Sequence, residues 1–159
     1  MADVAALQLL VPGAEPLLDA VRGLPGVGLL EPAHVSLGYP WRPAAEADPG
    51  LVALAAAQVP PFVLRFGALG RFGPDPRGRV LLHAVPDDDA PVRALARVVG
   101  GELRDTHLSI ARVLAGTDVD EVAARLEPLL PLTCPVGVLE LTLQRERVWL
   151  PGLRVRLSG

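Results

Sequence analysis

The sequence predicts an α+β fold built from two related halves. A short phrase occurs twice, as AHVSLG at residues 33–38 and as THLSIA at residues 106–111. A strand, a helix and a loop precede each copy in the same order, with 22 positions from Pro12 to His34 and 21 from Pro86 to His107. Such self-similarity is typical of a duplicated structural unit. We therefore expect a bilobal chain of duplicated β-α-β units, with antiparallel sheets around a central cleft.

The elements of the first half follow from local patterns. An apolar run that ends at Pro12 indicates a buried strand, and the helical spacing of the leucines after it indicates a helix. A segment rich in glycine and proline then leads to the first His-x-Ser strand. The expected elements are a strand at 5–11, a helix at 14–23, a loop at 25–33 and a strand at 34–40.

The rest of the chain continues the alternation of strands and helices. Asp48 can cap a helix with Pro49 in its first position, and alternating apolar residues after Pro61 indicate a strand. Acidic residues before the next helix favour its N-terminus. The expected helices are one at 49–58, one that opens at 86–89 and stops at 100–101, and one that is capped by Thr117 or Asp118 and runs to about Leu130. The expected strands are at 62–69, 79–85, 106–113, 138–144 and 148–157.

The composition agrees with one globular domain over residues 1–159, made of two pseudo-symmetric lobes. Half of the residues are hydrophobic and 21% are charged, which excludes a disordered chain. Aromatic residues make up only 4%, so we expect a core of alanine, valine and leucine. The length suffices for such a core without disulfides or metal.

The repeated phrase places polar side chains on one face of each strand. Side chains alternate between faces, so His34 and Ser36 share a face, and His107 and Ser109 do the same. The apolar residues between them point the other way. A single His-x-Ser in a strand is typical of an edge histidine and a surface serine. Two copies at equivalent positions of a duplicated chain indicate a functional site. If the polar faces meet across a cleft, they surround one small anion.

Two imidazoles around a phosphate can work as an acid and a base. Because the ordinary pKa of histidine is near 6.5, one ring can be neutral and the other charged at neutral pH. We predict that His34 and His107 are catalytic and that Ser36 and Ser109 donate hydrogen bonds to phosphate oxygens. This chemistry requires no metal and no cofactor.

At this point the chain resembles the two-histidine (2H) phosphoesterases, which include 2′,3′-cyclic nucleotide phosphodiesterases and 2′-5′ RNA ligases. The resemblance lies in HVSL at 34–37 and HLSI at 107–110, and it is supported by EPAHVSLGYPW, PFVLRF, RVLLHAVP and HLSIAR. It implies a bilobal α+β fold and a metal-independent enzyme that opens 2′,3′-cyclic phosphates. It also implies an acid role for His34 and a base role for His107. The alternatives are 2′-5′ RNA ligation and non-catalytic binding of a phosphorylated ligand or RNA end.

Four further residues are weighed against ordinary structural roles. Arg112 is a candidate phosphate ligand, although strict alternation from His107 turns it away from the cleft unless a bulge or the strand end restores it. Tyr39 and Trp41 either stack on a base or pack in the core or at its rim. His83 lacks a partnered serine, so we expect it to be structural or exposed.

Other polar and flexible residues fit structural roles better than binding roles. Asp87 to Asp89 are expected to cap a helix rather than to bind metal. The glycines at 67, 70 and 73 lack the Walker pattern and its lysine, so they are assigned to a hairpin turn.

Charge and cysteine content limit the partners. All 15 basic residues are arginines, the net charge is −3 and the pI is about 5.6. Because long nucleic acids are usually bound by basic proteins, we expect a nucleotide or a short RNA end with a cyclic phosphate. Cys134 is the single cysteine, which excludes an internal disulfide and fits a cytoplasmic location. We expect a monomer that has no signal peptide and does not enter a membrane.

Overall fold

The strands of the protein form one antiparallel sheet. The structure is a computed structural model that describes residues 3–159. The strands are β1 (Val4–Leu10), β2 (Val27–Leu29), β3 (His34–Pro43), β4 (Phe62–Phe72), β5 (Val80–Pro86), β6 (Leu108–Val113), β7 (Leu132–Val136), β8 (Val138–Arg145) and β9 (Val148–Arg156). Their order is β7-β4-β5-β6-β3-β1-β8-β9, and β2 pairs with β6.

The predicted α+β class with antiparallel strands is confirmed, but the two halves meet in an unexpected way. The signature strands β3 and β6 do not face each other across a gap, because they are neighbours in the sheet and pair at Val35 and Leu108. Both of these side chains are fully buried. The apolar sides of the two strands therefore contribute to a single core, and the halves are joined edge to edge.

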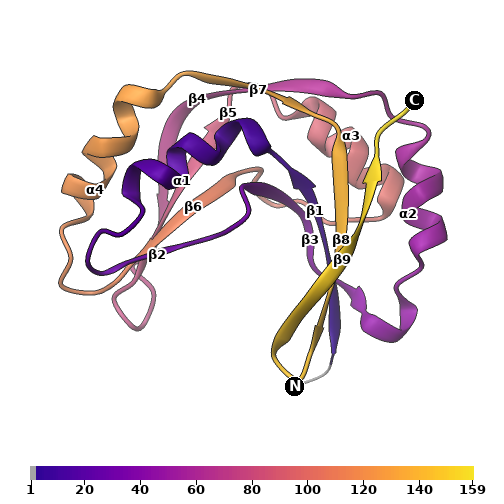
Figure 1. The fold of residues 1–159 in the computed structure, drawn as a ribbon, viewed down its shortest axis with the longest axis horizontal. Coiled ribbons are helices and arrows are strands. Elements are labelled where there is room, and N and C mark those ends of the chain that lie inside the picture. Colours follow the sequence, from indigo (N-terminus) through magenta and orange to yellow (C-terminus); the bar gives the residue numbers. More distant parts are fainter. Residues whose placement is uncertain (1–2) are drawn as a thin grey trace.

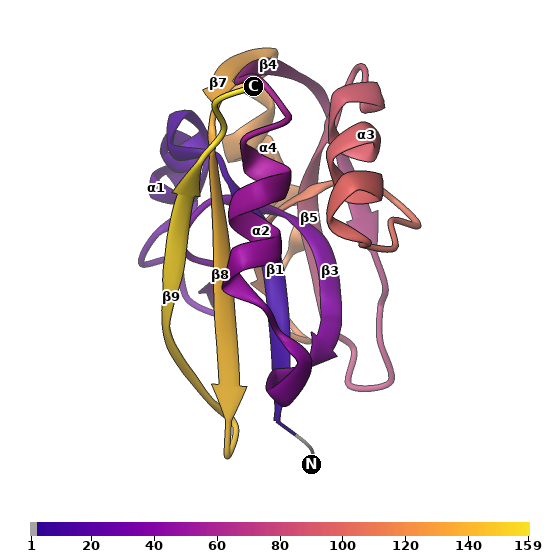
Figure 2. The ribbon, with the colours of Figure 1, turned by 90° about the vertical axis from the view of Figure 1, so that its right-hand side faces the viewer.

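Each helix pair covers one half of the sheet (Figure 1). The helices are α1 (Glu15–Val21), α2 (Pro49–Ala56), α3 (Ala90–Val99) and α4 (Val119–Leu126). Helix α1 packs with α4 and against β6, while α3 packs with α2 and against β3. Figure 2 shows α2 lying along the β8 and β9 side of the sheet. Helix α1, from the first half of the sequence, thus covers the strand of the second half, and α3 does the reverse.

Local capping explains where these helices begin and end. Asp48 accepts a hydrogen bond from the amide of Gly50 at 2.8 Å, with Pro49 at the start of α2, as predicted. Asp118 accepts hydrogen bonds from two amides at the start of α4. Helix α3 ends at Gly100, which has a φ of 71°, a left-handed conformation that glycine adopts without strain.

Two short strands, β2 and β7, were not predicted from the sequence. Strand β2 has three residues and lies inside the segment that was expected to be a loop. Strand β7 contains Pro135, which argues against a strand in the sequence but is tolerated because β7 lies at the edge of the sheet. Cys134, which precedes Pro135 on β7, is buried, and burial raises the pKa of its thiol.

The core consists mainly of leucine, valine and alanine, as expected. Phe66 on β4 is its largest fully buried side chain. The buried residues of α3 and α4, three or four positions apart along one face of each helix, complete the core. Within residues 3–159, the helices are all too short or too polar to cross a membrane.

Replacing Phe66 with alanine tests how much this core contributes to the stability of the fold. Phe66→Ala is expected to lower the free energy of unfolding by about 3–5 kcal/mol, because it leaves a cavity that the neighbours fill only in part. Val63→Ala is the matched control, since Val63 lies on the same strand with 59% of its surface exposed and should change stability by less than about 0.5 kcal/mol. Urea denaturation measures both, and equal losses would contradict the assignment of Phe66 to the core.

Candidate active site

The pairing of β3 with β6 brings the two signatures together. Because Val35 lies opposite Leu108 in antiparallel strands, His34 lies beside Ser109, and His107 lies beside Ser36. All four side chains point away from the core, onto what is here called the open face of the sheet. Each imidazole thus has the hydroxyl of the other half as its cross-strand neighbour.

Both imidazoles are held in the same way. Nδ1 of His34 donates to the carbonyl oxygen of Pro32 at 2.6 Å, and Nδ1 of His107 donates to the carbonyl oxygen of Asp105 at 2.9 Å. A carbonyl can only accept, so the proton of each neutral ring lies on Nδ1. Nε2 is then the nitrogen that each ring can offer to a substrate, as a proton acceptor when neutral and as a donor when charged.

A carboxylate at the start of a neighbouring helix anchors the residue before each histidine: Glu15 is the first residue of α1, and Asp89 directly precedes α3. Oε1 of Glu15 accepts a hydrogen bond from the amide of Ala33 at 2.8 Å. In the other half, Oδ2 of Asp89 accepts from the hydroxyl of Thr106 at 2.8 Å and from Nε of Arg93 at 2.7 Å. These bonds lower the pKa of Asp89, first through Thr106. The sequence pattern did not indicate either positioning role.

The acidic run before α3 has structural contacts. Asp88 accepts a hydrogen bond from the amide of Ala90 at 2.9 Å, whereas the side chain of Asp89 does not cap the helix. Asp87 pairs with Arg65. No group of three or more potential metal ligands occurs in the part of the chain from residue 3 onward.

His83 belongs to the same cluster of rings as His107. The ring centroids of His83 and His107 are 5.0 Å apart, and Phe72 stacks on His83 at 4.1 Å and meets His107 edge-on at 4.8 Å. His83 is 5% exposed, so of the two alternatives, a structural or an exposed ring, the exposed one is wrong. It pairs with Ser109 across the sheet. Sequence alternation within one strand could not reveal this neighbour on another.

Gly70 makes room for this third imidazole. Gly70 lies opposite His83 on β4, and a Cβ atom at Gly70 would overlap Nε2 of the ring. Nδ1 of His83 is buried, and residues 3–159 offer it no hydrogen-bond partner. The pKa of His83 is lowered, mainly by burial and then by repulsion from His107. His83 therefore resists taking a proton next to His107.

The pKa of His34 is also lowered. Burial is the largest cause, and repulsion from His107 acts in the same direction, whereas the Pro32 carbonyl and Glu140 oppose the shift. A lowered pKa favours the neutral ring at neutral pH. The repulsion also makes it unfavourable for both rings to carry a proton at once.

A bulge in β6 restores Arg112 to the open face. Ser109 pairs with His83, but Ala111 pairs with Leu82, so Ile110 is an extra residue that reverses the alternation. Arg112 then lies opposite Leu81, on the same face as Ser109, and its side chain is exposed. It lines a separate pocket beside β2, together with Arg79.

The two aromatic candidates, Tyr39 and Trp41, lie in different environments. Irregular pairing between β1 and β3 turns Tyr39 outward, where it is 59% exposed and contacts Trp149 with a centroid distance of 5.8 Å. Trp41 is only 9% exposed, and its Nε1 donates to the carbonyl oxygen of Val99 at the end of α3. Trp41 packs in the core and is not available to stack on a base, so of these two candidates Tyr39 remains.

A buried carboxylate that the sequence analysis did not identify extends the polar row from Ser36. Gln8 pairs with Ser36 across the sheet and donates to Oε1 of Glu140 at 2.7 Å. Arg154 donates through Nε to Oε2 of the same carboxylate at 2.7 Å. Glu140 is 6% exposed, and the two bonds offset the cost of burying its charge.

Comparison with known proteins assigns the family. A family model of the 2′-5′ RNA ligase superfamily matches residues 12–147, so the chain belongs to this superfamily. The resemblance of the two signatures to the 2H phosphoesterases is thereby confirmed. No curated protein sequence matches the chain.

Several solved structures share the fold. Escherichia coli LigT complexed with 3′-AMP is similar, with a TM-score of 0.62, 14% identity and 100% of both chains covered. A crystal structure described as a phosphoesterase has a TM-score of 0.63, 13% identity and the same coverage. Kluyveromyces marxianus Usb1 with uridine monophosphate has a TM-score of 0.56 and 14% identity, with 98% of both chains covered. At these identities the likeness is one of fold.

The lowered pKa of His83 predicts a pH-dependent stability. The unfolded chain binds a proton at His83 near pH 6.5, but the folded chain does so only at lower pH, so stability falls as the pH drops below about 6.5. His83→Gln removes this contribution, and its free energy of unfolding should fall less than that of the wild type between about pH 7.5 and about pH 5.5. Urea denaturation at both pH values measures the difference. An unchanged pH slope would mean that His83 titrates normally in the fold.

Proposed function

We propose that this protein is a metal-independent phosphodiesterase that opens 2′,3′-cyclic phosphates of RNA ends or nucleotides. The observation that carries the proposal is the matched pair of imidazoles on adjacent strands. Each is fixed through Nδ1 by a backbone carbonyl and retains Nε2 for a substrate. Membership in the 2′-5′ RNA ligase superfamily supports phosphodiester chemistry.

The reaction follows from one neutral and one charged ring. The neutral imidazole takes a proton from water, and the water oxygen forms a bond to phosphorus. The bond between phosphorus and one ribose oxygen breaks, and the charged imidazole gives its proton to that oxygen. When the 3′ oxygen leaves, the product is a 2′-phosphate. Ser36 and Ser109 donate hydrogen bonds to the non-bridging oxygens, where negative charge increases in the transition state.

The environment of His34 favours it as the base. Its lowered pKa keeps the ring neutral at neutral pH, and repulsion between the rings favours a single proton shared by the pair. His107 is then the acid. This assignment is the reverse of the one that the family resemblance implies, and it rests on the burial of His34.

Ligation is the second candidate activity, because the superfamily is named for it. A 5′-hydroxyl in place of water would attack the same phosphorus and form a 2′-5′ bond, with the same two imidazoles moving the protons. The products of an assay with an added 5′-hydroxyl oligonucleotide separate ligation from hydrolysis. A cleft that only binds a phosphorylated ligand would give neither product.

Substitution of the two histidines tests the catalytic assignment. His34→Ala and His107→Ala should each lower kcat for a 2′,3′-cyclic nucleotide by about 10²–10⁴-fold, because each removes one proton-transfer step. The assay contains a chelator, which should leave the wild-type rate unchanged. Unfolding midpoints close to that of the wild type would show that the variants fold. Full activity in both variants would remove the proposed roles, and loss of the wild-type rate on chelation would remove the metal-independent mechanism.

The pH dependence of kcat/KM tests the pair independently. A bell-shaped profile is expected, because one ring must be neutral and the other charged in the free enzyme. The acidic limb should lie below about pH 6.5, since the pKa of His34 is lowered. Initial rates at low substrate concentration give the profile. A profile without limbs on either side of neutrality would contradict acid–base catalysis by two histidines.

A further inference from the structure

Two rows of cross-strand neighbours connect the first signature to two arginines on β9. Residues paired across a sheet share a face, so each row lies wholly on the open face. One row begins at His34 and the other at Ser36. The first row is His34, Leu10, Val138 and Arg156, and the second is Ser36, Gln8, Glu140 and Arg154.

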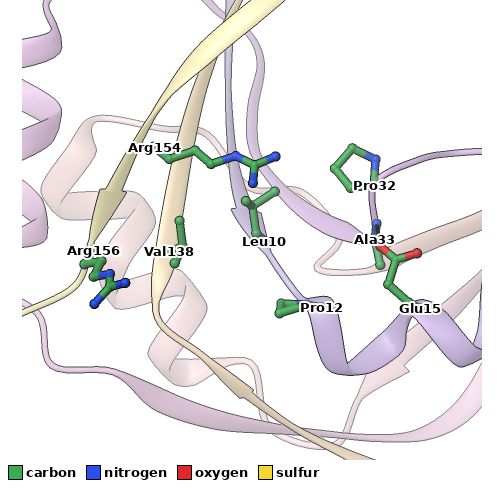
Figure 3. A pocket seen from close by; sticks show the side chains of 8 residues that line it. All are labelled: Leu10, Pro12, Glu15, Pro32, Ala33, Val138, Arg154 and Arg156. Carbon is green, nitrogen blue, oxygen red and sulfur yellow. Dashed lines mark hydrogen bonds between the residues drawn. The ribbon is translucent and has the colours of Figure 1, made fainter.

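A pocket of about 490 Å³ lies along the first row. Leu10 and Val138 contribute its apolar surface, and Pro32 and Ala33, the residues directly before His34, line it as well. Figure 3 shows Arg154 and Arg156 extending from β9 on one side of the pocket, with Pro32, Ala33 and Glu15 on the other side. The pocket therefore adjoins the candidate active site at His34.

Arg154 is held in place before any ligand arrives. Its Nε atom donates to the buried carboxylate of Glu140, which also accepts from Gln8. The two terminal nitrogens of Arg154 lie above Leu10 in Figure 3. A guanidinium fixed through Nε can offer both terminal nitrogens to the oxygens of one phosphate. The Glu140 network thus accounts for the orientation of this side chain.

Arg156 is the second cation of the pocket. Within residues 3–159 its side chain takes part in no ion pair or side-chain hydrogen bond, so its positive charge is not neutralised by direct contact. Glu15 lines the opposite side, where Oε1 already accepts the amide of Ala33 and Oε2 can accept a further hydrogen bond. Cations on one side, an acceptor on the other and an apolar surface between them suit a nucleotide better than a bare anion.

We propose that this pocket binds a second phosphate of the substrate, on the 5′ side of the nucleotide whose cyclic phosphate lies at the two imidazoles. The proposal rests on the proposed function, because it takes the cyclic phosphate to be bound at His34 and His107. Strand β9 is three strands away from β3, or about 14 Å between backbones. An arginine reaching back from β9 therefore meets the neighbouring phosphate of a nucleotide chain and not the one that reacts.

This second subsite also explains how an acidic protein can select RNA ends. The net charge of −3 gives no general attraction to a polyanion. Two arginines beside the reacting centre provide a local attraction instead. The substrate class that fits is an RNA end of at least two nucleotides, or a nucleotide that carries a 5′-phosphate besides its cyclic phosphate.

Three substrates measure this preference in the intact protein. They are adenosine 2′,3′-cyclic phosphate, its 5′-phosphorylated form, and the dinucleotide ApA with a 2′,3′-cyclic phosphate. We expect kcat/KM to be about tenfold or more higher for the substrates with a second phosphate, because charge-assisted hydrogen bonds to phosphate are strong. A gain with both identifies any phosphate at this position as sufficient. Because ApA also adds a nucleoside, a gain with ApA alone identifies the phosphodiester if it is lost in Arg156→Gln, and overturns the phosphate subsite if it persists there.

Arg156→Gln should reduce the ratio of kcat/KM between two-phosphate and one-phosphate substrates by about tenfold. Arg156→Lys, which keeps the charge but not the planar fork, should recover part of the ratio. Arg145→Gln is the matched control, because Arg145 lies on the same hairpin at its turn end and outside the pocket, and it should keep the wild-type ratio. Arg156 is preferred over Arg154 because loss of Arg154 also removes a partner from buried Glu140.

The outcomes separate the subsite from the proposed function. Equal kcat/KM values for all three substrates, or an unchanged ratio in Arg156→Gln, would overturn the subsite and leave the phosphodiesterase proposal standing. Inactivity of the wild type on every cyclic phosphate would overturn the proposed function instead. Equilibrium binding then tests the pocket alone, with linear ApA 3′-phosphate against adenosine 3′-phosphate. Binding of ApA 3′-phosphate that is about tenfold tighter and is lost in Arg156→Gln would support the pocket, and equal affinities would overturn it.

Discussion

The pairing of Val35 with Leu108 is the contact on which the candidate site depends. It joins the two halves of the sheet at one paired position and sets the register of both signatures. Because the strands run antiparallel, the imidazole of each half lies beside the hydroxyl of the other. Neither half therefore contains by itself an imidazole and its neighbouring hydroxyl on the adjacent strand. The buried face of this junction belongs to the same core that supports the rest of the molecule, so the geometry of the site and the stability of the fold have a common origin.

Much of this arrangement follows from the chain alone. Alternation within a strand determines that His34 and Ser36 share a face, and duplication determines that His107 and Ser109 are their equivalents. Helix caps at Asp48 and Asp118 are local signals and can be identified without a structure. These features depend only on residues near one another in the sequence, which is why they could be predicted.

Features that depend on pairing between strands could not be predicted in this way. An extra residue in β6 turns Arg112 onto the open face, and no composition or spacing marks the position of that bulge. His83 reaches His107 only because β5 lies next to β6, and Arg154 reaches the row of Ser36 only through β1 and β8. Trp41 carries no signal that distinguishes a core indole from one at a cleft; the carbonyl of Val99 that accepts its N–H lies 58 positions further along the chain.

The exchange of helices between the halves has a consequence for how the chain can be divided. Helix α1 covers β6 and α3 covers β3, so each half supplies the cover for the other's strands. Cleavage of the turn between β4 and β5 would give two fragments. In the first fragment β3 would lack α3, and in the second β6 would lack α1, so each fragment would expose an apolar strand face. Such fragments would gain most of their order only on reassociation, as in a split protein whose pieces complement one another.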